Sequence, residues 1–66
     1  MPKAKLVLKK LLNIGFKIVH QTGSHRKLRH ADGRQLIFAY HDNVDLGRVQ
    51  IANVAKDAGV KPEDLV

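Results

Sequence analysis

A chain of 66 residues and 7.4 kDa has room for a single domain over residues 1–66, which excludes a multi-domain enzyme and a deep cleft for a large cofactor. The absence of cysteine excludes disulfides, thiolate zinc sites and a cysteine nucleophile. The net charge of +6 is uneven, because residues 1–34 carry nine basic residues and one acid, whereas residues 35–66 carry three basic residues and five acids. This excess favours a polyanionic partner such as nucleic acid, although lysines that serve only solubility give the same composition.

The first predicted element is a basic amphipathic helix that ends at Gly15. Apolar residues recur with the spacing of one helical face, and they are Ala4, Val7, Leu8, Leu11, Leu12 and Ile14. Lysines fill most of the remaining positions and continue through Lys9 and Lys10 into the apolar stretch. We therefore expect no secretory signal, no membrane-spanning segment and a cytoplasmic location.

Three strands are predicted next, at residues 16–21, 25–30 and 35–40. The tight turn at 22–24 has Gly23 available for a positive φ, and residues 31–34 carry an Asp-Gly hairpin signal. Strands this short, joined by such turns, form an antiparallel meander.

A loop over 41–46 leads to a second helix, which we expect to be capped by Asp45 or Gly47 and to end at Gly59. One further turn is expected at Pro62–Leu65, with proline at its first position. The order predicts an α+β fold with a three-stranded antiparallel sheet and two helices on one face.

The turn Gly23-Ser24-His25 is the most suggestive feature for chemistry. Glycine lets backbone N–H groups approach an anion, and an imidazole accepts and returns protons near neutral pH. Period-two alternation places His25, Lys27 and Arg29 on one face of the second strand. RNA cleavage needs such a base beside positive charge, but a hairpin turn followed by a solvated strand face has the same pattern.

Histidines 20, 25 and 30 are spaced by five, which raises the possibility of a metal site. Odd spacing alternates strand faces and no carboxylate or cysteine supports these residues, so we expect no metal and no cofactor. His41 is interpreted as a surface loop residue at the end of the sheet.

The remaining basic residues can be read as phosphate contacts or as solvated surface; they are Lys3, Lys5, Lys9, Lys10, Lys17, Arg26 and Arg34. Phe16 and Phe38 are expected in the core, and no aromatic platform for base stacking is present. The third strand is apolar on both faces. Ile37 is therefore either exposed for a protein partner or part of simple edge packing.

The segment Gly15–His25, GFKIVHQTGSH, resembles the hallmark segment of the HicA toxin family. The Asp-Gly turn at 31–34, His41 after the third strand and the helix end at Val60 follow in the family's order. The chain departs from the family at Ala39, where a proline is common, and in the basic character of its second strand.

The resemblance implies a fold like that of double-stranded-RNA-binding domains, with α-β-β-β-α order. It also implies a metal-independent endoribonuclease toxin that cleaves mRNA and is neutralised by a HicB-type antitoxin. Without its antitoxin, the protein is expected to be a monomer or a weak dimer. His25 matches the family's catalytic histidine, with Gly23 and Ser24 shaping the turn. We expect Gly23, Ser24, Lys27 and Arg29 to contact RNA, with Lys27 and Arg29 as electrostatic helpers. The alternatives are a non-catalytic RNA-binding module of the same fold and a degenerate member that binds only antitoxin.

Overall fold

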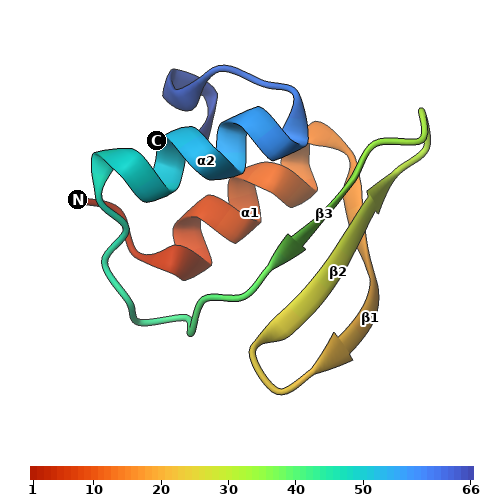
Figure 1. Cartoon of the computed structure of the whole chain (residues 1–66), viewed down its shortest axis with the longest axis horizontal. Coiled ribbons are helices and arrows are strands. Elements are labelled where there is room, and N and C mark those ends of the chain that lie inside the picture. The colour runs from red at the N-terminus through yellow and green to blue at the C-terminus, as the bar shows by residue number, and fades with distance from the viewer.

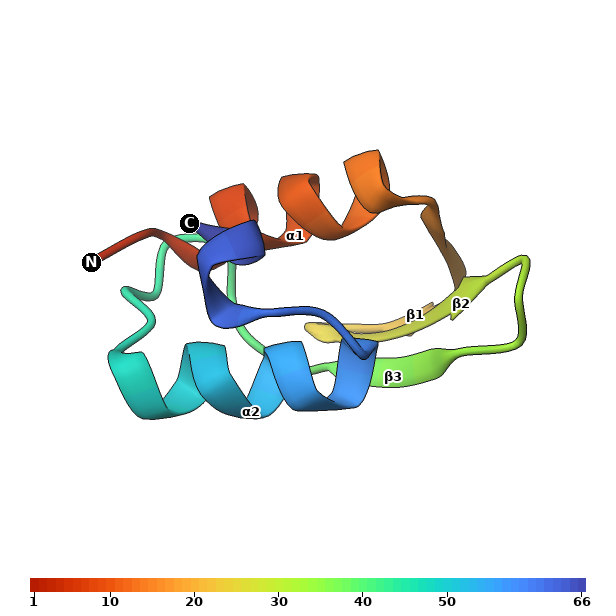
Figure 2. The same ribbon diagram turned by 90° about the horizontal axis from the view of Figure 1, so that it is seen from above.

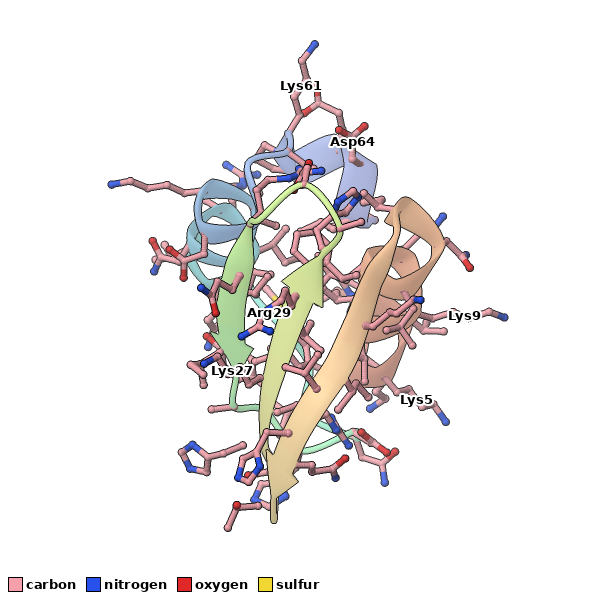
Figure 3. The ribbon with its side chains drawn as sticks, turned by 90° about the vertical axis from the view of Figure 1, so that its right-hand side faces the viewer. Lys5, Lys9, Lys27, Arg29, Lys61 and Asp64 are labelled. Atoms are coloured by element: carbon pink, nitrogen blue, oxygen red, sulfur yellow. The ribbon has the colours of Figure 1, made fainter.

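Two helices, three strands and a short 3-10 turn make up the computed structural model, which describes residues 1–66. In chain order they are α1 (Ala4–Ile14), β1 (Phe16–Thr22), β2 (His25–His30), β3 (Gln35–Phe38), α2 (Arg48–Ala58) and η1 (Pro62–Leu65). The strands form one antiparallel sheet in the order β1-β2-β3, and both helices lie behind it in Figure 3. The predicted α+β fold with α-β-β-β-α order is confirmed (Figure 1). Neither helix combines the length and hydrophobicity that crossing a bilayer requires.

The core lies between the two helices and the inward face of the sheet. The sheet contributes Phe16, Leu28, Leu36 and Phe38, all of them buried. The helices contribute Ala4, Val7, Leu8 and Leu11 from α1 and Ile51, Val54, Ala55 and Ala58 from α2. Of the other two residues predicted on the α1 face, Ile14 is partly buried against the core, whereas Leu12 is 40% exposed and the prediction was wrong. Figure 2 shows η1 between the two helices, where its Leu65 is buried against both.

The start of α1 is held by a distant segment of the chain. The N–H of Ala4 donates to the carbonyl of Val44 at 2.8 Å, and that of Lys5 donates to the carbonyl of Asp42 at 3.1 Å. A salt bridge of 3.0 Å between Lys3 and Asp45 reinforces the contact. The first amides of a helix have no partner inside the helix, so the loop after β3 supplies the caps that the local sequence lacks.

Strand β3 ends earlier than the sequence predicts, whereas the start of α2 agrees with the prediction that Gly47 can cap it. Strand β3 stops at Phe38, two residues earlier than expected, because the chain beyond it leaves the sheet to reach the start of α1. Helix α2 begins after Gly47, whose N–H donates to Gln50 Oε1 at 2.6 Å. The predicted helix end at Gly59 and the turn that Pro62 begins are confirmed.

Candidate functional site

Strand β2 alternates between the two faces of the sheet as its sequence predicts. Arg26, Leu28 and His30 point towards the helices and are partly or fully buried. His25, Lys27 and Arg29 point the other way, and Figure 3 shows Lys27 and Arg29 along the face that no helix covers. We call this uncovered side the open face; the prediction that these three residues share it is confirmed.

A β-bulge in β1 adds a histidine to the open face. Ile18 pairs with Leu28, but the next pairing joins His20 to Lys27, so the register slips by one residue at Val19. His20 therefore shares a face with Lys27 and is a diagonal neighbour of His25, whose direct partner is Thr22. The odd spacing of His20 and His25 in the sequence predicted that they lie on different faces of the sheet. That prediction was wrong, because the sequence contains no signal of the bulge.

His25 follows a two-residue turn at the exposed end of the sheet. Gly23 has a φ of 61°, in the left-handed region, and the backbone N–H groups of Gly23 and Ser24 donate to no backbone carbonyl. The histidine that lies beside a carboxylate in this protein is His30, not His25. The His25 ring is thus exposed, with free amides on its N-terminal side and Lys27 two residues further along the strand.

His30 is held in place by the fold. Its Nε2–H donates to the carbonyl of Ile14 at 3.2 Å, and its Nδ1 lies 3.2 Å from the backbone nitrogen and 3.1 Å from Oδ1 of Asp32. The ring also packs edge-on against Phe16, with centroids 5.2 Å apart. Its side chain is 19% exposed, and its hydrogen bonds serve the junction between α1 and the sheet.

Arg34 joins the β2–β3 turn to the end of α2. Its Nε donates to Asp32 Oδ2 at 2.8 Å, its Nη1 donates to the carbonyl of Ala58 at 2.8 Å, and its guanidinium lies 5.3 Å from the Phe16 ring centre. The backbone N–H of Arg34, followed by its guanidinium and His30, lowers the pKa of the Asp32 carboxyl. Of the two sequence interpretations of Arg34, phosphate contact or solvated surface, the structure supports neither.

Arg26 was expected at the surface, as a phosphate contact or a solvated side chain, but the structure places it largely inside the protein. Its side chain turns inward, is 12% exposed, and donates from Nη2 to Asp42 Oδ1 at 2.9 Å. Its Nη1 is buried and has no hydrogen-bond partner in the protein. His41, interpreted from sequence as a surface loop residue, is exposed and lies across an open hollow from the Gly23-Ser24 turn.

Positive charge dominates the open face and the adjoining side of α1. Lys17 is the register partner of Arg29, and Lys5 and Lys9 project from α1 beyond β1 in Figure 3. Ile37, the partner of Lys27, is 57% exposed and supplies an apolar spot on this basic surface. No three histidine or acidic side chains come close enough together to hold a metal ion.

The chain matches a known protein family. A family model described as "HicA toxin of bacterial toxin-antitoxin" covers residues 4–60, which is most of the chain and includes every residue of the open face. No curated protein matches the sequence.

Proposed function

Because this chain belongs to the HicA toxin family of bacterial toxin–antitoxin systems, we propose that it is an endoribonuclease that cleaves mRNA with His25 as its general acid and base. The toxin role and a nuclease activity in general follow from the family. The observation that supports the finer assignment is the exposed imidazole of His25, which lies between the free amides of a glycine turn and the cation of Lys27.

The proposed reaction uses only groups on the open face. His25 accepts the proton of a ribose 2′-hydroxyl, whose oxygen attacks the adjacent phosphorus while the bond to the 5′-oxygen breaks. The imidazolium then returns the proton to the departing 5′-oxygen, which leaves a cyclic phosphate and a free hydroxyl. No metal or cofactor enters this step.

Lys27 and Arg29 stabilise the negative charge that grows on the phosphate oxygens. Both lie on the face of β2 that carries His25, at successive outward positions about 7 Å apart. The amides of Gly23 and Ser24, which the turn holds in place, add donors for a backbone phosphate of the bound RNA.

A non-catalytic RNA-binding module of the same fold is the alternative. It is favoured by the absence of a carboxylate beside His25, since general bases in other enzymes are commonly oriented by one. RNA binding without cleavage by the intact chain would support this alternative and reject the ribonuclease.

The deciding experiment compares His25→Ala with His20→Ala. Both remove an exposed imidazole from the open face, but only His25 follows the glycine turn. The His25 variant is expected to lose about 10²–10⁴-fold in cleavage rate, because that is the usual contribution of a general base. His20→Ala is expected to lose far less, and thermal unfolding should show both variants folded. Cleavage by His25→Ala at the parent rate would reject the assignment.

A HicB-type antitoxin and mRNA are proposed to compete for the open face. An acidic antitoxin surface complements the charges of Lys27 and Arg29, so Lys27→Glu with Arg29→Glu should weaken both RNA and antitoxin binding. RNA affinity should also fall with salt, with a logarithmic slope near 0.7 for each phosphate contact. Undiminished antitoxin binding by the double variant would place the antitoxin elsewhere, with the exposed Ile37 as the next site to test.

A further inference from the structure

The hollow beside the β1–β2 turn is built entirely from polar residues. It has a volume of about 500 Å³, within the range of about 300–1,000 Å³ typical of ligand sites. Its six lining residues are Gly23, Ser24, Arg26, His41, Asp42 and Asn43. Figure 1 shows the two segments that form it, the β1–β2 turn and the chain leaving β3, at the same end of the sheet. A hollow that no hydrophobic residue lines, and that has Arg26 in its wall, is suited to an anionic ligand.

Hydrogen-bond donors around the hollow are unusually free. The backbone N–H groups of Gly23, Ser24 and the segment 41–43 donate to no backbone carbonyl. The carbonyls of Asp42 and Val44 accept hydrogen bonds from the start of α1, so the loop uses its acceptors to cap the helix while the amides of residues 41–43 stay unbonded to backbone. Successive unpaired amides in a turn or loop form a binding site for anions.

Arg26 adds a buried cation to these amides. Its Nη2 is bonded to Asp42 Oδ1, which offsets the charge of that carboxylate, and its Nη1 is buried without any partner. A buried guanidinium N–H that lacks an acceptor is destabilising, so a shift of the Arg26 side chain that brings Nη1 to the surface of the hollow would let a ligand oxygen accept a charge-assisted hydrogen bond from it. The orphaned donor and the free amides therefore favour the same kind of ligand.

We propose that this hollow binds an RNA backbone phosphate adjacent to the one cleaved at His25. The inference rests on the proposed ribonuclease function and extends it from one phosphate to two. Ser24 belongs to the hollow and His25 to the open face, so a strand that crosses the turn places neighbouring phosphates at the two positions. Arg26 is then a positioning residue, which contacts the phosphate that does not react.

The first experiment uses inorganic phosphate as the probe and follows backbone amide chemical shifts. Saturable shifts are expected at Gly23, Ser24 and Asn43. The variant Asn43→Glu places a negative charge at the rim of the hollow and should abolish them. Asn13→Glu makes the same chemical change at an exposed position of α1 and should leave them intact. Shifts confined to other residues, or none at all, would overturn the proposal.

The second experiment measures how much one additional phosphate in the substrate raises kcat/KM. The parent protein should cleave a trinucleotide with a kcat/KM about tenfold above that of the matching dinucleotide, as a charge-assisted contact predicts. In Asn43→Glu this ratio should fall towards one, while Asn13→Glu keeps it. An unchanged ratio in Asn43→Glu would reject the second phosphate position.

Arg26→Gln provides an independent test, since it removes the guanidinium but keeps an amide of similar length. It should also lower the trinucleotide-to-dinucleotide ratio and reduce the salt slope of RNA affinity by about 0.7. If the loss of its Asp42 contact unfolds this variant, Asn43→Glu decides the matter alone. Should the parent protein cleave neither substrate, the ribonuclease assignment fails while the phosphate titration still tests the hollow.

Discussion

The two ends of the sheet use the same residue types in opposite ways. At the β2–β3 end, His30 makes two hydrogen bonds and packs edge-on against Phe16, and Arg34 donates hydrogen bonds to Asp32 and to α2. At the β1–β2 end, His25 is exposed and Arg26 keeps a buried nitrogen without a partner. The hydrogen bonds at the β2–β3 end stabilise the junction between the sheet and the helices. At the β1–β2 end, by contrast, donors without a protein acceptor can serve a ligand. Residue identity alone does not separate these roles; the hydrogen-bond partners do.

The glycines that flank β1 give the largest expected contrast in stability. Gly15 has a φ of 120°, and an added Cβ would lie 2.7 Å from His30 Nε2, whereas Gly23 has no atom within 4 Å of that position. Gly15→Ala should lower the free energy of unfolding by about 3 kcal/mol, from backbone strain and the displaced histidine. Gly23→Ala should lower it by about 1 kcal/mol. Urea unfolding measures both, and equal losses would contradict the contrast.

Removal of the bonded histidine is the next largest effect. His30→Ala should lower the free energy of unfolding by about 2 kcal/mol, because it deletes two hydrogen bonds and the edge of the Phe16 ring pair. The cleavage rate of the folded fraction should stay near that of the parent. If His30→Ala instead unfolds at the parent midpoint, the hydrogen bonds of His30 contribute nothing to the junction.

A smaller contrast compares two arginines. Arg34→Gln should cost about 1 kcal/mol of stability, because its contacts with Ala58 and the Phe16 ring are lost. Arg29→Gln should change stability by less than about 0.5 kcal/mol, as expected for an exposed side chain, and should instead weaken RNA binding. Thermal unfolding and RNA affinity, measured for both variants, test whether Arg34 serves stability and Arg29 serves RNA binding. A loss of stability in the Arg29 variant would contradict this difference.

The smallest expected effect is on the pH dependence of stability. The pKa of Asp32 is lowered in the folded protein from its ordinary value of 3.8, first by the backbone N–H of Arg34. The stabilisation is therefore complete above the unfolded-state pKa and is lost as the pH falls through the folded-state pKa. Asp32→Asn should flatten the decline of the unfolding free energy below about pH 4. If the unfolding free energy of this variant falls at acid pH as steeply as that of the parent, other carboxylates cause the fall.

Local patterns in the sequence predicted most of the fold. The apolar spacing of α1, the strand at 25–30 and the glycine at the end of each helix depend on neighbours within a few residues, and the structure confirms them. The outward positions of His25 and Lys27 followed from strand alternation for the same reason.

The features that the sequence did not reveal depend on contacts between distant residues. The bulge at Val19 changes the face of His20, and it arises from the pairing of two strands rather than from either alone. Arg26 is buried because Asp42 lies beside it, sixteen residues further along the chain. Strand β3 ends early because the loop after it must reach Ala4.

The reliance of α1 on residues 42–45 bears on how the protein is made. Ala4 has its amide partner only once Val44 has been synthesised, and the core closes only when Leu65 is in place between the helices. Translation at about 5–20 residues per second therefore leaves a delay of seconds between the first helix and a closed core. During that interval the apolar face of α1 is without the η1 residues that pack against it in the folded protein, so the core is among the last parts of the fold to be completed.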